Sequence, residues 1–331
     1  ASQLSQLTGT IRKKFTNFAF FEGMENSRTQ QATISVIIPH LNQGKQLRRC
    51  LTALGAGHRI PDEVIVVDNG SHTVPDEICG DFAWVTLISQ PLRGPGLARN
   101  LGAAQATGEL LAFIDADCFP ELTWLAEAEN SFRDPGVHIS GGDVKISYVD
   151  PHHLTAVEAY ESIFSYRMGH YIKRQGFCGT GNLVVRRDIF ERIGPFKGLT
   201  VAEDREWGHR ACFKGYHIRY APKQVVYHPA RPSLDALQLK WDRQLTHDWA
   251  ECSSNWGRIT WAMKAMALAL SPLPAVARII CSSRVTGLRN RASAWFVLVR
   301  IRLFRTKRMM LLLNGADASR HLEQWNKFDA L

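Results

Sequence analysis

The chain has 331 residues, of which 45% are apolar and 21% are charged, a composition typical of a folded globular protein and not of a disordered one. Its seven cysteines are odd in number, widely spaced and free of any CxxC pair, which argues against a disulfide framework and against a zinc knuckle. The cysteines therefore predict a reducing, cytoplasmic location. Residues 1–30 do not have the pattern of a signal peptide, so secretion is not predicted.

The net charge of +9 comes from one segment of the chain. Residues 252–316 contain eleven Lys or Arg residues and no Asp or Glu. Without these eleven cations the rest of the chain carries −2 (9 − 11), so the basicity needs an explanation specific to this segment.

Strands and helices alternate through the first two thirds of the chain, most regularly before residue 117. Strands are predicted at 34–38, 64–67, 84–89 and 110–114, and helices at 45–54, 75–79 and 95–106. Pro95 suits the first turn of its helix, and Gly108 stops that helix before the next strand. Repeated β-α-β units of this length predict an α/β fold with a mostly parallel, doubly wound sheet flanked by helices.

The pattern is less regular after residue 117. Further strands are predicted at 137–140, 144–148, 183–185, 218–220 and 225–227, and further helices at 122–132, 153–168, 188–193 and 202–214. A long helix is predicted at 234–249, with Ser233 as its N-cap.

Two aspartates, Asp115 and Asp117, follow the apolar strand at 110–114. Ligands of parallel sheets bind beyond the carboxyl ends of the strands, so both carboxylates are expected to face a crevice. Carboxylates suit Mg²⁺ or Mn²⁺, which proteins often bind together with phosphate oxygens. The pair therefore predicts an enzyme that handles a nucleoside diphosphate, although an acidic turn after a strand is an alternative explanation.

Six short motifs, taken together, resemble the family 2 glycosyltransferases with the GT-A fold. They are SVIIPHLN at 35–42, VVDNGS at 66–71, GLARNLG at 96–102, DAD at 115–117, GTGN at 179–182, and Glu203-Asp204 followed by His228-Pro229. The resemblance spans roughly residues 33–229. It implies a GT-A fold and a nucleotide-sugar donor.

The resemblance also implies roles for single residues on the donor side. Pro39, His40 and Asn42 would line the nucleotide site, and Asp68 would accept the N–H of the base. Asn69 departs from the family pattern, which usually has a second aspartate there, so the base preference stays open, with a UDP-sugar favoured. Arg99 would bind the nucleotide or fix the DAD loop. The spacing around Arg99 does not fit a dinucleotide fingerprint, because Arg99 stands where its third glycine is needed.

The remaining roles concern the metal, the sugar and the acceptor. Asp115 would lie near the ribose, while Asp117 and His228 would bind Mg²⁺ or Mn²⁺. Gly181, Asn182 and Glu203 would line the sugar and acceptor side. Asp204 would be the catalytic base, taking the proton of an acceptor hydroxyl as it attacks the anomeric carbon with inversion. Simple helix capping by Glu203 and Asp204, and a structural role for His228, are the alternatives.

The basic segment mixes its cations with tryptophan, methionine and phenylalanine. Its longest charge-free run, residues 265–277, is too short for a membrane span, which needs about 20 apolar residues. Attachment to an anionic membrane surface is predicted, with a helical subdomain packed on the core or on a second protomer as the alternative. Nucleic-acid binding is not predicted, because no known nucleic-acid-binding module accompanies the cations.

Three regions are therefore predicted: an N-terminal extension at 1–32, a GT-A catalytic domain at 33–232, and a basic helical region at 233–331. The predicted protein is a metal-dependent, inverting glycosyltransferase at the inner face of the cell membrane. It would move one sugar to a glycan or lipid-linked acceptor. The alternatives are a nucleotidyltransferase that makes a sugar donor and a non-catalytic membrane scaffold. The oligomeric state is left open.

Overall fold

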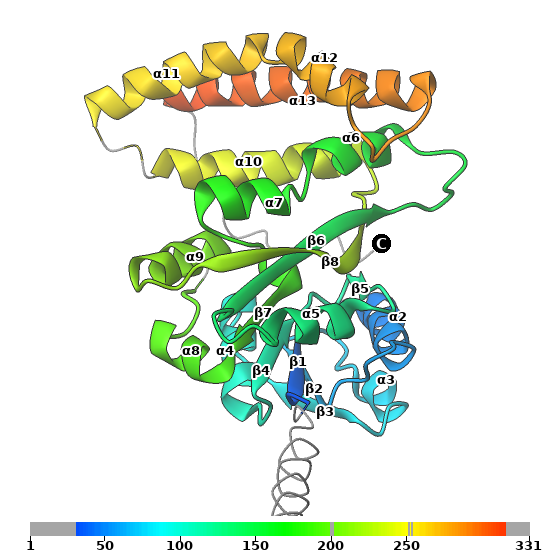
Figure 1. Ribbon diagram of the computed structural model, residues 1–331. Helices are drawn as coiled ribbons and strands as arrows, with labels where there is room; N and C mark the ends of the chain where they lie inside the picture. The colour runs from blue at the N-terminus through cyan, green and yellow to red at the C-terminus, as the bar shows by residue number, and fades with distance from the viewer. Residues whose placement is uncertain (1–30, 199–201, 251, 253, 316–331) are drawn as a thin grey trace, which may run out of the picture. The chain divides into compact units, whose positions relative to one another are not determined.

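The computed structural model describes residues 31–198, 202–250, 252 and 254–315. The chain divides into two units, Ala1–Ala32 and Thr33–Leu331. Almost all of the predicted N-terminal extension lies outside the described residues. The second unit contains every helix and strand of the described chain (Figure 1).

An eight-stranded sheet with the order β3-β2-β1-β4-β7-β6-β8-β5 lies at the centre of the second unit. Its parallel half consists of β1 (Ile34–His40), β2 (Glu63–Asp68), β3 (Val85–Ser89) and β4 (Leu110–Phe113). The apolar residues of β1, β2 and β4 are almost fully buried, as expected for central parallel strands. This half confirms the predicted α/β architecture.

Strand β1 is longer than predicted, because Pro39 does not end it. The carbonyl oxygen of His40 accepts the backbone N–H of Asn69, which directly follows β2. Because the backbone groups of successive strand residues point to opposite sides, those of Pro39 point toward β4. Strand β4 pairs with β1 only as far as Ile37, where it meets Phe113. A proline is tolerated at position 39 because no ladder hydrogen bond is required of it there.

The other half of the sheet is mixed. It contains β7 (Leu183–Arg186), β6 (Ile139–Ser147), β8 (Ile218–Pro229) and the short β5 (Phe119–Pro120). Strand β7 is antiparallel to both β4 and β6, β5 is antiparallel to β8, and β6 and β8 are parallel. The prediction missed β5, which is only two residues long.

Strands β6 and β8 are each continuous, whereas the sequence predicted two strands in each region. The register shifts by several residues in the middle of the pair: Gly142 lies opposite Ala221, and Asp143 lies opposite Val225. Residues 222–224 of β8 form a bulge at this point. Gly141 and Gly142 of β6 and the Pro-Lys-Gln of β8 interrupt the strand pattern of the sequence. In the structure they lie at this bulge and do not end either strand.

Helices α2 (Gly44–Gly55), α3 (Asp76–Gly80), α4 (Pro95–Gln105) and α5 (Trp124–Phe132) begin and end close to their predicted limits. Helix α4 packs closely on the sheet at Gly102, where a Cβ would lie 2.5 Å from Cγ2 of Ile37. This contact sets the position of the remaining α4 side chains over the ends of β1 and β2.

The predicted helix at 153–168 is broken. Helix α6 (Ala156–Phe164) begins with a capping box between Thr155 and Glu158 and ends before Tyr166, which has a φ of +48°. The chain then forms α7 (Met168–His170) and a π-helix at Tyr171–Gln175. The break brings Tyr166 to the end of β8, where its ring lies 4.7 Å from that of His228.

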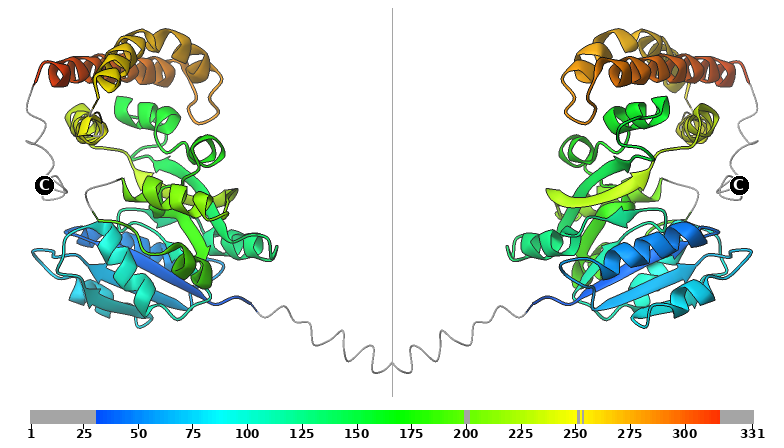
Figure 2. Two further views of the ribbon diagram at one scale, coloured as in Figure 1. Left: turned by 90° about the vertical axis from the view of Figure 1, so that its left-hand side faces the viewer. Right: turned by 90° about the vertical axis from the view of Figure 1, so that its right-hand side faces the viewer.

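Six more helices follow in the described part of the chain. They are α8 (Arg187–Ile193), α9 (Glu203–Phe213), α10 (Leu234–Ala250), α11 (Asn255–Leu270), α12 (Pro272–Ile280) and α13 (Leu288–Leu313). Helix α8 contacts β7, and α10 to α13 form a separate layer over α6 (Figure 1). Ser233 caps α10, as predicted, by accepting the backbone N–H of Ala236 at 3.1 Å. Helix α13 packs on α6 and α10 on one side and on α11 and α12 on the other (Figures 1 and 2).

Candidate active site

Two cavities lie beyond the carboxyl ends of the strands. The first has a volume of about 250 Å³ and is lined by Pro39, His40, Leu41, Gln43, Asn69, Pro95, Arg99, Asp115, Ala116 and Asp117. The second, of about 340 Å³, is lined by Asp115, Gly181, Asp204 and His228, by residues of α10, and by Tyr166, Tyr171 and Phe177. Asp115 therefore lies between the two cavities and lines both.

His40 and Asp68 form a buried pair beside the first cavity. Nε2 of His40 accepts the backbone N–H of Gln43, so Nδ1 is the protonated nitrogen and donates to Oδ1 of Asp68 at 3.0 Å. Burial lowers the pKa of His40, although Asp68 opposes this effect. His40 lines the cavity, whereas Asp68 supports His40 from behind and does not line it.

Asn69 has a structural role that explains its departure from the family pattern. Its Nδ2 donates to the carbonyls of Gln90 and Leu92, and its Oδ1 accepts the N–H of Gly94 at 2.7 Å. A carboxylate could not donate to those two carbonyls. Asn42, predicted to bind the nucleotide, lines a neighbouring cavity together with His72, whose N–H it accepts.

Arg99 joins Asp115, in the loop after β4, to helix α9. It is 4% exposed, and its guanidinium donates to Asp115 at 2.5 Å and to Glu203, whose other oxygen accepts the N–H of Gly96. Burial opposes the charge of Arg99, but the two carboxylates raise its pKa overall. Burial raises the pKa of Glu203, and Arg99 counteracts this. Glu203 lines neither cavity, so it positions Arg99.

Gly181 and Asn182 act in different ways, although they are adjacent. A Cβ on Gly181 would lie 2.6 Å from Oδ2 of Asp115, so only glycine leaves this carboxylate in place. Asn182 is fully buried and was predicted to face the substrate. The structure instead uses its amide within the protein: it donates to the carbonyls of Asp143 and Gln224 and accepts from Trp124 and Gln224, each at 2.8 Å. Asn182 therefore holds β6, β8 and α5 together.

Asp204 lies in the first turn of α9 and lines the second cavity. Its Oδ1 accepts the backbone N–H of Arg205 at 2.7 Å. Burial raises the pKa of Asp204, and this effect exceeds the opposing influence of that hydrogen bond and of Arg99. A carboxylate with a raised pKa in a cavity is suited to accept a proton near neutral pH.

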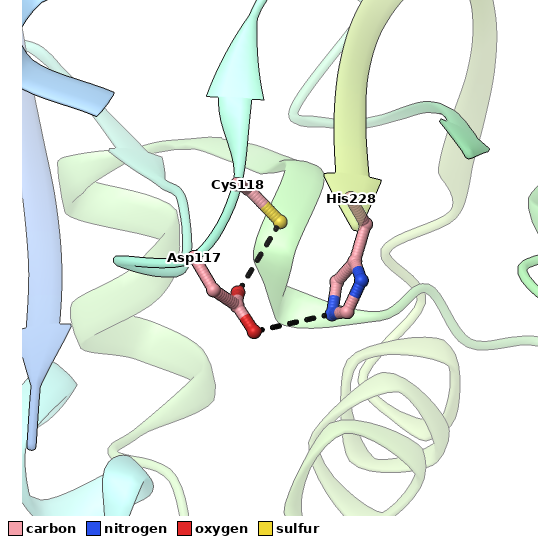
Figure 3. A group of neighbouring side chains, drawn as sticks. All are labelled: Asp117, Cys118 and His228. Carbon is pink, nitrogen blue, oxygen red and sulfur yellow. Dashed lines mark hydrogen bonds and ion pairs between the residues drawn. The ribbon is translucent and has the colours of Figure 1, made fainter. Parts of the chain in front are cut away.

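Asp117, Cys118 and His228 lie together where the chain after β4 meets the end of β8, and their ligand atoms are within 4.8 Å of one another (Figure 3). Nε2 of His228 is 3.4 Å from Oδ2 of Asp117. Nδ1 of His228 is 2.6 Å from the carbonyl oxygen of Pro229, which can only accept, so Nδ1 carries a proton. Nε2 therefore faces the Asp117 carboxylate, and these two groups could bind one cation between them.

The carboxylate of Asp117 and the imidazole of His228 suit a divalent cation such as Mn²⁺ or Mg²⁺. A carboxylate suits Mg²⁺ and Mn²⁺, and an imidazole is accepted more readily by Mn²⁺ than by Mg²⁺. Burial raises the pKa of the Cys118 thiol well above its usual value, and the thiol points to Asp117 as a hydrogen-bond donor. Asp117 and His228 would therefore be the protein ligands, with Cys118 supporting Asp117.

Several residues of the second cavity were missed by the sequence prediction. Arg231 pairs with the buried Glu161 at 2.5 Å, and Lys240 lies 5.5 Å from the ring centre of Tyr166. Burial and the nearby Arg231 lower the pKa of Lys240 to about 7. The spacing of Lys240, Trp241 and Gln244 places these residues on one face of α10. This spacing is the feature of the sequence from which their shared position could have been predicted.

The fold and the two acid-lined cavities define an α/β enzyme with its site beyond the strand ends. Residues 35–194 match the family model described as glycosyl transferase family 2. The chain is 36% identical over 214 residues to glycosyltransferase AglE of Haloferax volcanii, covering 62% of this chain and 69% of that protein. The chain therefore belongs to glycosyl transferase family 2, and it is a glycosyltransferase.

More distant similarities agree with this assignment. The pre-mycofactocin glycosyltransferase of Mycobacterium tuberculosis is 28% identical over 218 residues, which cover 61% of this chain and only 43% of that protein. The mannosyltransferase PcManGT from Pyrobaculum calidifontis, solved in complex with GDP-Man and Mn2+, has a similar fold, with a TM-score of 0.57 at 20% identity over 87% of this chain and 89% of that one. The predicted GT-A fold is thus confirmed, and the family favours a glycosyltransferase over the nucleotidyltransferase and scaffold alternatives.

Proposed function

We propose that this protein transfers one sugar, with inversion and with the help of a divalent cation, from a nucleoside-diphosphate sugar to a hydroxyl group of a glycan or lipid-linked saccharide. The observation that carries the proposal is the position of Asp115 between two cavities. One cavity is lined by the residues expected to hold a nucleotide, and the other by the acid expected to act as base.

The first cavity suits the donor nucleotide. The ring of His40 and the side chains of Pro39 and Leu41 offer apolar surface to a base, and Arg99 and Asp115, which are hydrogen-bonded to each other, line the same cavity. A UDP-sugar was favoured from the sequence, whereas PcManGT was solved with GDP-Man.

Asp117 and His228 would hold Mn²⁺ or Mg²⁺ at the junction of the cavities. When bound, the cation would neutralise the negative charge that develops on the leaving nucleoside diphosphate. The chain's own contribution is to orient both ligands: Cys118 donates to Asp117, and the Pro229 carbonyl fixes the tautomer of His228.

The second cavity suits the acceptor, with Asp204 as the base. Among the described residues that line it, the carboxylates are Asp115 and Asp204, and Arg99 binds Asp115. A single available carboxylate fits direct displacement, in which Asp204 takes the acceptor proton and the configuration is inverted. The cations Arg205, Arg231 and Lys240 in the same cavity suit an acceptor that carries phosphate.

The test is a panel of UDP- and GDP-sugars with Mn²⁺, with Mg²⁺ and with chelator, comparing wild type with Asp117→Asn and Asp204→Asn. Asp188→Asn is the matched control, because Asp188 is likewise an acid in the first turn of a helix but is exposed. Asp204→Asn should lower kcat at least about 1,000-fold. Asp117→Asn should also weaken Mn²⁺ binding measured by calorimetry without substrate.

The pH dependence follows from the raised pKa of Asp204. The base is active only when deprotonated, so kcat/KM should fall as the pH drops through this pKa, above the ordinary value of about 4 for aspartate. NMR of the product should show the opposite anomeric configuration to the donor. Retained configuration, turnover by Asp204→Asn at the wild-type rate, or full activity in chelator would each contradict the corresponding part of the proposal.

A further inference from the structure

Helices α11 and α12 expose a continuous apolar face that no described part of the chain covers. Large apolar residues recur along it at intervals of three or four, and each is between 39% and 73% exposed. We define the apolar face as Trp256, Ile259, Met263, Met266, Leu270, Leu273, Val276 and Ile280. The intervals follow the helical repeat, so these side chains lie along one side of the helix pair.

The opposite side of the same helices is packed on α13. Trp261, Ala265 and Ile279 are each less than 5% exposed. Trp261 also donates from its indole nitrogen to the carbonyl of Met309, and Thr306 donates to the carbonyl of Ala265. The apolar face is therefore the outward side of a helix layer that is firmly attached to α13 (Figure 1).

The charges around the face are of one sign. Arg258, Lys264 and Arg278 are exposed on α11 and α12, and residues 252–316 contain no carboxylate side chain. An anionic lipid surface attracts each nearby cation by about 1 kcal/mol, and Trp and Met side chains of this size fit the boundary between headgroups and acyl chains. A second copy is a poorer partner, because a two-fold contact would bring identical cations together without acids.

From this arrangement we infer that the apolar face of α11 and α12 docks this protein onto an anionic lipid bilayer, with both helices lying in the plane of the membrane surface. Within the described residues, no single helix has the length and apolar composition of a membrane span. Helices α11 and α12 meet that criterion only together, and they are bent by 51°. Crossing would also take the buried side, and with it the five cations of residues 300–308 on α13, into the bilayer.

This inference is narrower than the prediction from the sequence, and it does not depend on the proposed transfer. The sequence pointed to the whole basic segment, and the cations of α13 are spread around that helix. The structure assigns the contact to α11 and α12 and leaves α13 as the support that holds them.

The test is vesicle flotation of the full chain. Wild type should float with vesicles of phosphatidylcholine mixed with phosphatidylglycerol, less with phosphatidylcholine alone, and less at high salt. A variant with Trp256→Ser, Met263→Gln, Met266→Gln and Leu270→Gln should bind at least about 100-fold more weakly. Lys264→Gln with Arg278→Gln should weaken binding about tenfold or more, and only on the anionic vesicles.

The matched control replaces three exposed apolar residues elsewhere: Leu92→Gln, Val149→Gln and Phe213→Ser, which are 67%, 94% and 93% exposed. This variant should float like wild type, and melting curves should show that all variants are folded. Equal flotation of wild type and the face variant would overturn the inference, as would a wild type that binds no vesicles. A wild-type dimer that the face variant dissociates, with no flotation of either, would assign the face to a second copy instead.

Discussion

Arg99 shows how much of this site rests on one side chain. It is buried and pairs with Asp115, just after β4, and with Glu203 on α9, two segments that are far apart in the chain. The Glu203 carboxylate in turn holds the N–H of Gly96 in the helix that carries Arg99. Arg99 therefore fixes Asp115 at the boundary of the two cavities, and removing it would leave two neighbouring carboxylates uncompensated.

Gly181→Ala tests whether the position of Asp115 matters for transfer. The added methyl would lie 2.6 Å from Oδ2 of Asp115 and must displace it. Because a displacement of about 1 Å at a reacting site can cost about 100-fold, we expect kcat/KM to fall by about 10- to 100-fold with little change in melting temperature.

Gly179→Ala is the matched control for Gly181→Ala. It lies in the same loop, and its added methyl would meet only the flexible end of Met168, at 3.0 Å. We expect kcat/KM to stay within about threefold of wild type. Equal kinetics for both variants would show that Asp115 does not need its present position.

At the scale of elements, the paired strands β6 and β8 carry His228 to the candidate metal site beside Asp117 and Cys118. Their bulge is closed by Asn182, whose amide binds the carbonyls of Asp143 and Gln224. The side chain of Gln224 also accepts the hydroxyl of Ser140, so the unpaired polar groups of the bulge find partners inside the protein. These contacts make Asn182 and Gln224 structural residues, although they lie next to the site.

Gly142→Ala should therefore destabilise the protein through this bulge. Its Cβ would lie 2.1 Å from the carbonyl oxygen of Gln224 and 2.2 Å from Nδ2 of Asn182, and neither of these can move freely. We expect a loss of about 2–3 kcal/mol in the free energy of unfolding, measured by urea denaturation. Gly80→Ala in α3, where a Cβ meets nothing within 4 Å, is the control and should stabilise by about 0.5–1 kcal/mol. A loss below 1 kcal/mol for Gly142→Ala would contradict the tight packing.

At the scale of the whole molecule, the helices after β8 are joined to the catalytic part by specific contacts. Arg284 donates to both carboxylate oxygens of Asp143 at 2.7 Å, and Tyr148 donates to the carbonyl of Arg284. Asp242 of α10 accepts from Arg308 of α13. Five of the cations in the basic segment are partly buried: Arg284, Arg291, Arg302, Arg305 and Arg308. The exposed cations remain available at the surface.

Lys240→Met tests how the buried charge of Lys240, on α10 at the second cavity, affects the stability of the folded protein. The lowered pKa of Lys240, about 7, means that the native state loses this proton before the unfolded chain does, near pH 10.4. The unfolded state then binds more protons between those pH values, so wild-type stability gains from Lys240 deprotonation as the pH rises from about 7. Below pH 7 Lys240 stays protonated in the folded protein, and the burial of its charge then lowers the free energy of unfolding most.

We therefore expect Lys240→Met to stabilise the protein by about 1–2 kcal/mol near pH 6, with a smaller gain near pH 9. Urea denaturation at both pH values measures it, and the other titrating groups cancel in the comparison with wild type. Lys223→Met, at an exposed position on β8, should show no such pH dependence. A gain that is the same at both pH values would show that Lys240 stays charged.

The sequence by itself determined the parallel half of the sheet, helices α2 to α5 and the family. These features depend on residues close together in the chain: apolar runs, glycine and proline positions, and short motifs such as the one containing Asp115 and Asp117. Ser233 was predictable as a cap for the same reason.

Only the tertiary structure decided how β6 and β8 pair, which residues line each cavity, and which side of the basic segment is exposed. These features depend on contacts between distant parts of the chain, such as that of Arg99 with Glu203, 104 residues away, and that of Asn182 with Gln224, 42 residues away. Local patterns mark Asn182 as a candidate ligand and predict two separate strands on either side of the Pro-Lys-Gln of β8. In the folded chain, Asn182 is instead a buried residue that hydrogen-bonds to Asp143 and Gln224. The Pro-Lys-Gln segment forms a bulge within one continuous strand.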